Sequence, residues 1–260
     1  MSRNSDAATS PVRDAVILMA GAGSRLGGSV AKPLVQVGGR PLISYTFEAL
    51  SRAGVRDVHL VLGANSDRLA AAVREVSGSL SCHEIKNPEW QKQNGVSVLC
   101  AAGKVSAPFF LLMGDHLFDF AVLDALLAQS DPAHVNLAID RKIETIFDID
   151  DAMKVQTEAD RVVAIAKDLA QYNAIDTGAF LCSIEIFDYL KRSQRDGDCS
   201  LADGIRLMAG ERKVRAVDIG DAWWQDVDTP AMLQRAEKES ARLLRESGRG
   251  LAQESVSSQH

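Results

Sequence analysis

The sequence predicts an α/β fold with a mostly parallel central sheet and helices on both faces. Short, continuous apolar runs such as Ala15–Ala20 and Phe109–Met113 are typical of strands that are covered on both sides. Segments with helical spacing lie between these runs, and an alternation of strands and helices favours a parallel sheet. At 260 residues, the chain is long enough to form either one large α/β domain or two small ones.

We expect the first half of the chain, residues 14–139, to carry this alternation. A loose tail is expected over residues 1–13, before structure begins at Asp14. The predicted strands are 15–20, 58–62, 109–113 and 135–139, and the predicted helices are 41–53, 67–76, 97–105 and 120–129. Ligands of open α/β sheets bind beyond the carboxyl ends of the strands, so we expect the site near Gly21 and near Gly114-Asp115.

The second half, residues 140–228, has a different pattern. A β-hairpin is predicted from 154–156 and 161–166, strands at 177–182 and 214–219, and helices at 184–191 and 201–209. Thr229-Pro230 is a typical helix start and opens a C-terminal helix over 229–246. A disordered polar tail is expected over 247–260.

Composition excludes several classes of partner. Lysine and arginine total 29 against 35 acidic residues, a net charge of −6, and no run of basic residues offers a nucleic-acid surface. The four cysteines lack metal-binding spacing and fit a reducing compartment. No apolar run is long enough for a transmembrane helix, and the start of the chain lacks a secretory signal. We therefore expect a cytoplasmic protein.

The glycine-rich segment Gly21–Gly28 follows the first predicted strand and precedes Lys32-Pro33. Leu26 stands where the dinucleotide fingerprint requires glycine, and the segment is not a P-loop either. Successive backbone N–H groups in such a loop form a nest for phosphate oxygens. Arg25 adds a planar guanidinium and Lys32 a mobile charge, which together could neutralise a triphosphate.

These motifs resemble those of nucleotidyltransferases that join a nucleotide to a sugar phosphate or an alcohol phosphate. The resemblance starts from Ala20–Leu26, Lys32–Leu34 and Gly39–Ile43 and extends to about Glu239. A closer resemblance to inositol-1-phosphate cytidylyltransferases is carried by Asn87–Trp90, Asn94–Ser97, Met113–His116, Ala166–Leu169, Ile175–Gly178 and Asp226–Pro230. It implies a Rossmann-like nucleotidyltransferase fold whose halves bind the nucleotide (14–139) and the acceptor (140–228), with the hairpin on the acceptor side.

The resemblance implies transfer of CMP from CTP to an alcohol phosphate, with inositol 1-phosphate as the expected acceptor. Asp115 and Asp228 would hold one Mg²⁺, an ion that is usually shared with substrate phosphates. The implied catalytic residues are Arg25, Lys32 and Lys167; the nucleotide-binding residues are Ala20, Gly21, Ala22, Gly23, Ser24, Asn94 and Gly95; and the acceptor-binding residues are Asp140, Lys154, Lys167, Asp176 and Thr177.

Structural roles remain open for several of these residues. Asp228 could cap a helix and Asn94 could be an N-cap, while the acceptor-side charges could be solvated or form a salt bridge within the hairpin. His116 is expected to be a packed residue or a neighbour of a ligand rather than a zinc ligand, because no second histidine lies near it in sequence.

Other functions remain open as well. The acceptor could be choline phosphate, 2-aminoethylphosphonate or a sugar 1-phosphate, and a non-catalytic nucleotide-binding module or a dehydrogenase are alternatives of other classes. A cationic acceptor prefers aromatic rings with a carboxylate. Aromatic residues make up 5% of the chain and few lie near the acceptor motifs, which favours a polyol. The expected product, a CDP-alcohol, would be used by a separate membrane phosphotransferase, and a homodimer is compatible with the sequence.

Overall fold

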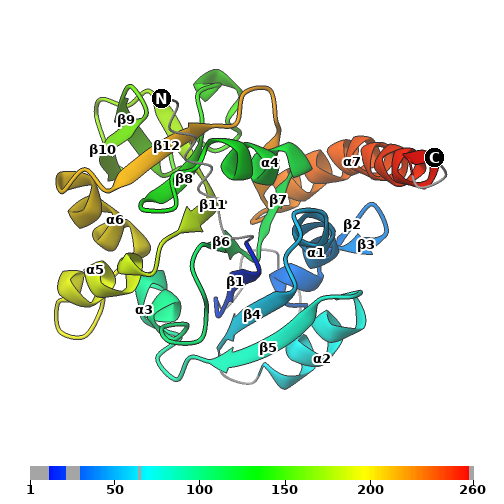
Figure 1. Cartoon of the computed structure of the whole chain (residues 1–260), viewed down its shortest axis with the longest axis horizontal. Helices are drawn as coiled ribbons and strands as arrows, with labels where there is room; N and C mark the ends of the chain where they lie inside the picture. Colours follow the sequence, from blue (N-terminus) through cyan, green and yellow to red (C-terminus); the bar gives the residue numbers. More distant parts are fainter. Residues whose placement is uncertain (1–11, 22–29, 64–65, 258–260) are drawn as a thin grey trace, which may run out of the picture.

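The computed structural model describes residues 12–21, 30–63 and 66–257. Within these residues, nine strands form one sheet in the order β5-β4-β1-β6-β11-β8-β12-β10-β9 (Figure 1). Their bounds are β1 Asp14–Met19, β4 Asp57–Leu62, β5 Ser81–Lys86, β6 Phe109–Met113, β8 Val135–Asp140, β9 Lys154–Glu158, β10 Arg161–Ala166, β11 Ala174–Cys182 and β12 Val214–Asp218. The predicted α/β fold is confirmed, and β9 and β10 form the predicted hairpin.

The sheet is mixed rather than purely parallel. Strands β11 and β10 run opposite to the other seven, and β11 lies between β6 and β8. Its pairing with β8 shifts register between Asp176 and Phe180, around Gly178, which has a φ of +74°. A residue in this left-handed region is a local irregularity that glycine adopts without strain. The irregularity occurs where β11 passes the candidate site.

Helices cover both faces, as the alternation along β1 requires. The side chains of Ala15, Ile17 and Met19 belong to one buried cluster, and Val16 belongs to the other. The first cluster includes residues of α1 (Leu42–Arg52), α2 (Asp67–Glu75) and α4 (Phe120–Gln129), and the second includes residues of α3 (Asn94–Leu99), α5 (Glu185–Ser193) and α6 (Leu201–Gly210). Figure 1 shows these two sets on opposite sides of the sheet.

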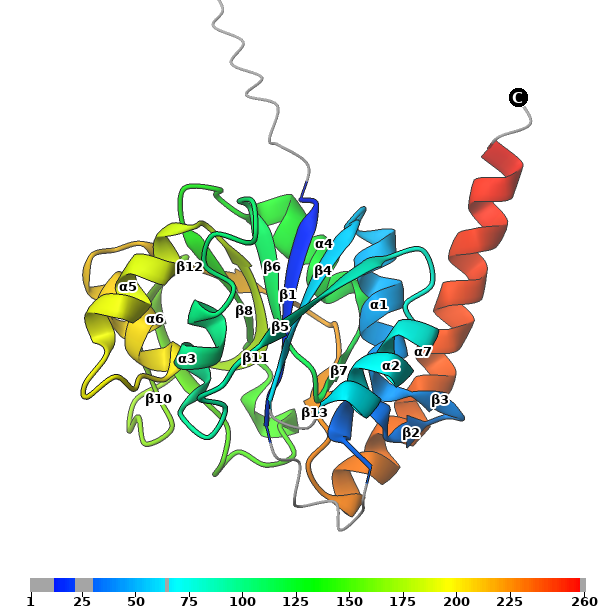
Figure 2. The same cartoon turned by 90° about the horizontal axis from the view of Figure 1, so that it is seen from below.

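Two helices differ most from the sequence prediction. Helix α3 begins at Asn94, three residues before the predicted start, and ends at Leu99, where turns replace the predicted last part. Helix α7 spans Pro230–Ser257 and so continues past its predicted end at residue 246. Near its start, Ala236 and Leu243 of α7 pack in a third buried cluster, and Figure 2 shows its later part extending beyond the body of the molecule.

Two short strand pairs were not predicted. Strands β2 (Gln36–Val37) and β3 (Arg40–Pro41) form one, and β7 (His116–Phe118) and β13 (Trp224–Asp226) form the other. Two single-turn helices, η2 (Lys32–Leu34) and η3 (Ile143–Thr145), complete the described elements. Among the described helices, none combines the length and apolarity needed to cross a membrane.

Candidate active site

The β7–β13 ribbon joins two segments that lie more than 100 residues apart in sequence. His116 pairs with Asp226 in this antiparallel ribbon, and the Val227 N–H donates a 2.8 Å hydrogen bond to the carbonyl oxygen of Asp115. The ribbon therefore brings Asp115, just before β7, next to Asp228, just after β13. We call these two residues the carboxylate pair.

Lys32 connects the two members of the carboxylate pair. Its Nζ lies 3.2 Å from Oδ2 of Asp115 and also forms an ion pair with Oδ1 of Asp228. Burial alone would lower the pKa of Lys32, but the two carboxylates raise it above its ordinary value. The lysine is therefore charged, and both carboxylates are within reach of one cation.

His116 holds Asp115 from the other side. Its Nδ1 lies 2.9 Å from Oδ1 of Asp115, and its ring stacks on Trp224 with a centroid separation of 5.9 Å. A Cβ on Gly178 would lie 2.7 Å from Nε2 of His116, so only glycine leaves room for the ring there. The expectation that His116 is a packed residue beside a ligand agrees with these contacts.

Charges around His116 change the ionisation of their neighbours. Burial alone would raise the pKa of Asp115, but His116 and Lys32 lower it well below its usual range. Burial likewise favours the neutral form of His116, but Asp115, with Asp226 and Asp176, raises its pKa. Asp115 is consequently a carboxylate at all physiological pH values.

The carboxylate pair fits the donor set that Mg²⁺ prefers. Both groups supply oxygen ligands, and the ammonium of Lys32 already contacts both, which shows that one cation can lie between them. Among the residues that the structure describes, no group of three or more histidine, cysteine or acidic side chains forms a metal cage. A metal held here would therefore complete its coordination with water and substrate phosphate, as is typical of Mg²⁺.

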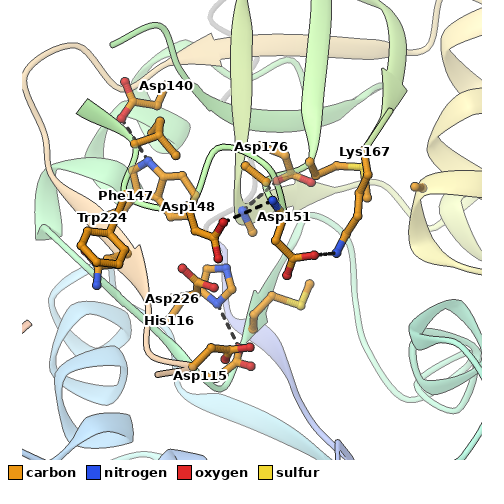
Figure 3. A pocket seen from close by; sticks show the side chains of 18 of the residues that line it. Asp115, His116, Asp140, Phe147, Asp148, Asp151, Lys167, Asp176, Trp224 and Asp226 are labelled. Atoms are coloured by element: carbon orange, nitrogen blue, oxygen red, sulfur yellow. Dashed lines mark hydrogen bonds and ion pairs between the residues drawn. The ribbon is translucent and has the colours of Figure 1, made fainter. Parts of the chain in front are cut away.

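A cavity of about 330 Å³ opens beside the carboxylate pair (Figure 3). Its polar lining is mainly acidic, and four aromatic side chains besides His116 also face it. The acidic members are Asp115, Asp140, Asp148, Asp151, Asp176, Asp226 and Asp228, the basic ones are Lys142, Lys167 and Arg235, and the aromatic ones besides His116 are Phe147, Phe180, Trp223 and Trp224. The sequence indicates few aromatic residues near the acceptor motifs, but Phe147 and the two tryptophans line the cavity from segments that the motifs do not include.

Asp140 lies at the end of β8 and is almost fully buried, with 2% exposure. Oδ1 accepts hydrogen bonds from the N–H and the Nζ of Lys142, both at 2.8 Å, and Oδ2 accepts one from Nε1 of Trp224 at 3.0 Å. Asp140 lines the cavity, and its contacts fix the positions of Lys142 and Trp224.

Asp176 and Thr177 are neighbours on β11 whose side chains face opposite ways. Asp176 lines the cavity, and burial raises its pKa to about 6, although the Gly178 N–H donates a 2.7 Å hydrogen bond to its Oδ1. Thr177 is buried and its Oγ1 donates to the carbonyl oxygen of Ala138 at 2.9 Å. Thr177 is therefore not a lining residue of the cavity in which it was expected to bind the acceptor, because successive strand residues point to opposite faces of the sheet.

The two predicted acceptor lysines have different positions. Lys167 lines the cavity and forms an ion pair with Asp151. Lys154 is not among the lining residues, and its Nζ donates to the carbonyl oxygen of Lys167 at 2.7 Å. Lys154, which was expected in the acceptor site, therefore lies behind Lys167 and contacts its backbone rather than the cavity.

Residues 141–153, between β8 and β9, form a loop that we call the acceptor-side loop. Its Phe147 is 51% exposed and lies 5.7 Å from the guanidinium of Arg235, which donates to the carbonyl oxygen of Thr145 at 3.1 Å. Arg235 comes from α7, so the C-terminal helix fastens this loop over the cavity. Sequence analysis missed Arg235, Lys142 and the aromatic residues; the only signal was helical spacing on α7, which places Arg235 one turn and a half after Pro230.

At the nucleotide end, Ala20 and Gly21 follow β1, and the predicted phosphate-binding residues Ala22, Gly23, Ser24 and Arg25 lie outside the described residues. Asn94 lines the cavity at the start of α3, where its Oδ1 accepts a 2.8 Å hydrogen bond from the Leu201 N–H.

Gly95 is buried, and a Cβ there would lie 2.6 Å from the carbonyl oxygen of Cys199. This glycine therefore permits a close approach to the segment before α6.

Comparison with known proteins identifies the family. A model of the MobA-like NTP transferase domain matches residues 15–146, which is 132 of the 260 residues. The chain belongs to this family. The nucleotidyltransferase family predicted from Ala20–Leu26 and Lys32–Leu34 is therefore confirmed.

Relatives of this MobA-like transferase include proteins with larger chains. It is 33% identical over 228 residues to the "Bifunctional IPC transferase and DIPP synthase" of Thermococcus kodakarensis, covering 86% of this chain and 50% of the relative. It is 34% identical over 254 residues to the "CMP-5'-(3-aminopropyl)phosphonate synthase" of Streptomyces rubellomurinus, covering 87% and 38%. The chain thus spans about half or less of the length of these curated relatives.

A solved structure matches over nearly the whole chain. The inositol-1-phosphate CTP transferase from T. maritima superposes with a TM-score of 0.81 at 28% identity, covering 90% of this chain and 96% of that one. The shared fold includes the mixed sheet and both helical layers described above.

Proposed function

We propose that this MobA-like transferase moves CMP from CTP to a small phosphate-bearing acceptor, with inositol 1-phosphate as the first candidate. The observation that carries the proposal is the carboxylate pair. Lys32 joins its two members at one end of a cavity whose other walls carry polar side chains able to hydrogen-bond to the hydroxyl groups of a polyol. The similarity to the T. maritima transferase supports the choice of CTP and inositol 1-phosphate.

The reaction needs no covalent intermediate on the protein. An oxygen of the acceptor phosphate attacks the α-phosphorus of CTP, and the bond from that phosphorus to the oxygen of the leaving pyrophosphate breaks. Because the attacking oxygen is already ionised, the task of the protein is to position two anions and to offset their charge.

Three cationic side chains and one backbone segment carry this task in the proposal. Lys32 offsets charge at the α-phosphate, and Arg25 and the Gly21–Gly23 backbone hold the β- and γ-phosphates. Lys167 meets the acceptor phosphate from the opposite wall, where Lys154 braces its backbone. Positive groups directed at developing charge are usually the largest single contribution in such reactions.

Asp115 and Asp228 would hold a divalent cation, and His116 fixes the orientation of Asp115. When bound, the cation supplies charge stabilisation for the phosphoryl oxygens. Asn94 would lie beside the cytosine, and its amide offers a donor and an acceptor to the edge of the base.

A second acceptor class is favoured by the lining of the cavity. Asp148, Asp176 and Asp226, with Phe147 and Trp224, form an acidic and aromatic wall that suits an ammonium group as well as hydroxyl groups. The relative from Streptomyces rubellomurinus, named for an aminopropylphosphonate, supports this alternative. An ω-aminoalkyl phosphonate or phosphate is therefore the second candidate.

A pyrophosphate-release assay tests the proposal and separates the two candidates. CTP, UTP, GTP and ATP would each be combined with inositol 1-phosphate, 2-aminoethylphosphonate, choline phosphate and glucose 1-phosphate in the presence of Mg²⁺. We expect CTP with inositol 1-phosphate to give the highest kcat/KM. Turnover confined to the ammonium-bearing acceptors would transfer the assignment to the second class, and no turnover with any pair would refute the proposal.

A further inference from the structure

Lys32 occupies the point where the carboxylate pair converges. Its Nζ contacts both carboxylates, and the exposed fraction of its side chain is only 16%, equal to that of Asp228. A lysine that merely awaited a phosphate would not need to be held between two acidic side chains from distant parts of the sequence. The contact therefore calls for an explanation in the metal-free protein.

An ammonium and a divalent cation cannot use the same pair of oxygens in the same way. An ammonium contacts carboxylate oxygens at about 2.8 Å, whereas Mg²⁺ binds oxygen at about 2.0–2.1 Å in a tight octahedron. We infer that the Lys32 ammonium holds the metal position between Asp115 and Asp228 in the metal-free protein, and that a divalent cation binds by displacing it. This inference rests on the proposed function only in taking the carboxylate pair as the metal ligands.

The backbone around Lys32 favours such an exchange by side-chain rotation. Lys32 opens η2, whose turn is closed by hydrogen bonds from Leu34 N–H to the Ala31 carbonyl oxygen at 2.8 Å and from Val35 N–H to the Lys32 carbonyl oxygen at 3.1 Å. The next residue, Pro33, is buried. The main chain is thus anchored, while the four-carbon stem of lysine has several rotatable bonds.

The exchange makes metal binding depend on the nucleotide. Without a nucleotide, the metal has to separate Lys32 from two carboxylates, so its apparent affinity is reduced by the small fraction of molecules in which the lysine has left. A triphosphate offers the displaced ammonium a new anionic partner. Metal and nucleotide should therefore bind cooperatively, each raising the affinity of the protein for the other.

The test is a titration of the nucleotide-free protein with Mn²⁺, followed by electron paramagnetic resonance of the free ion. Lys32→Gln should bind Mn²⁺ at least about tenfold more tightly than the wild type, because nothing has to be displaced. Lys142→Gln is the matched control: it removes the same charge from the cavity that the carboxylate pair lines, but Lys142 bonds to Asp140 and to the carbonyl oxygens of Gly220 and Ala222. Its affinity should change less than about threefold.

Thermal denaturation gives a second readout for variants that fold poorly without metal. Lys32→Gln and the more apolar Lys32→Met should melt at lower temperature than the wild type without metal and gain more from added Mg²⁺, since the ion replaces the positive charge that Lys32 supplies to the two carboxylates.

Equal Mn²⁺ affinities of wild type and Lys32→Gln would overturn the inference. An equally large gain in affinity in Lys142→Gln would overturn it too, because the gain would then come from the overall charge of the region and not from the displacement of Lys32. If no variant binds Mn²⁺, the exchange and the metal ligands are both wrong. Tightening in Lys32→Gln without CMP transfer in the acceptor panel would instead support the exchange and refute only the proposed function.

Discussion

At the metal end of the cavity, the chain brings Lys32, Asp115 and Asp228 into one ion-pair network. Lys32 is the first residue of η2, Asp115 directly precedes β7, and Asp228 lies between β13 and α7. At the acceptor end, the lining comes from the acceptor-side loop, from β11 and from Arg235 on α7. The first end is built from strand termini and the second from a loop fastened by a distant helix. The difference suggests that the chemistry is fixed by the sheet, while acceptor choice can vary with the loop.

The largest expected effect comes from the metal end. Asp228→Asn should lower kcat/KM for CMP transfer by about 10²–10³-fold, because an amide cannot replace a carboxylate that binds a cation. The measurement is pyrophosphate release with CTP and inositol 1-phosphate. Asp119→Asn is the matched control, since Asp119 caps α4 and pairs with Arg242 outside the cavity lining. Asp228→Asn with more than a tenth of wild-type activity would contradict the assignment.

A second prediction concerns Gly178, which joins the two ends. Gly178→Ala places a Cβ 2.7 Å from Nε2 of His116 and 3.0 Å from Cγ of Met113, so the imidazole that orients Asp115 has to move. We expect kcat/KM to fall about tenfold, as for other residues that orient a metal ligand. The free energy of unfolding should also fall by at least about 2 kcal/mol, because the left-handed φ and the clash both destabilise the folded variant.

Gly39→Ala is the control for Gly178→Ala, because it separates the effect of backbone strain from that of a side-chain clash. Gly39 has a φ of +80°, but a Cβ there meets no atom within 4 Å. It should lose about 1 kcal/mol of stability and keep full activity. Equal kinetic losses in both variants would show that His116 is not held by Gly178.

The contrast between the two ends of the cavity also explains which of their residues could be predicted from the sequence. Asp115 could be placed from the sequence because it follows a buried strand, Lys32 because it stands in the contiguous Lys32–Leu34 motif, and Asp228 because it precedes a recognisable helix start. The β7–β13 ribbon that joins them could not, since three-residue strands have no detectable period.

The acceptor end was harder for a physical reason. The register shift of β11 around Gly178 and the fastening of the acceptor-side loop by Arg235 depend on tertiary contacts between segments far apart in sequence. Aromatic residues such as Phe147 were overlooked because a loop without periodicity gives no indication of which side chains turn inward.

The third prediction compares the two acceptor lysines. Lys167→Met should raise the KM for the acceptor about tenfold and leave the KM for CTP unchanged, because a charge-assisted hydrogen bond to the acceptor phosphate is lost. Lys154→Met should raise the same KM less than about threefold, since its Nζ contacts the backbone of Lys167 and the ring of Tyr172 and is not a lining group of the cavity. Initial rates at saturating CTP with varied acceptor measure both. Equal effects, or a change in the KM for CTP, would contradict this division of roles.

The smallest effect is expected at Thr177, where sequence and structure disagree most directly. Thr177→Val keeps the shape of a buried side chain and removes the hydrogen bond to the Ala138 carbonyl oxygen. It should lower the free energy of unfolding by about 1 kcal/mol, measured by urea denaturation, and change the acceptor KM less than about twofold. Asp176→Asn, one residue earlier on the cavity face, should raise that KM several-fold without a comparable loss of stability, because its carboxyl is a lining group. A large KM effect at Thr177 would mean that β11 adopts another register when the acceptor binds, since a one-residue slip exchanges the two faces of a strand.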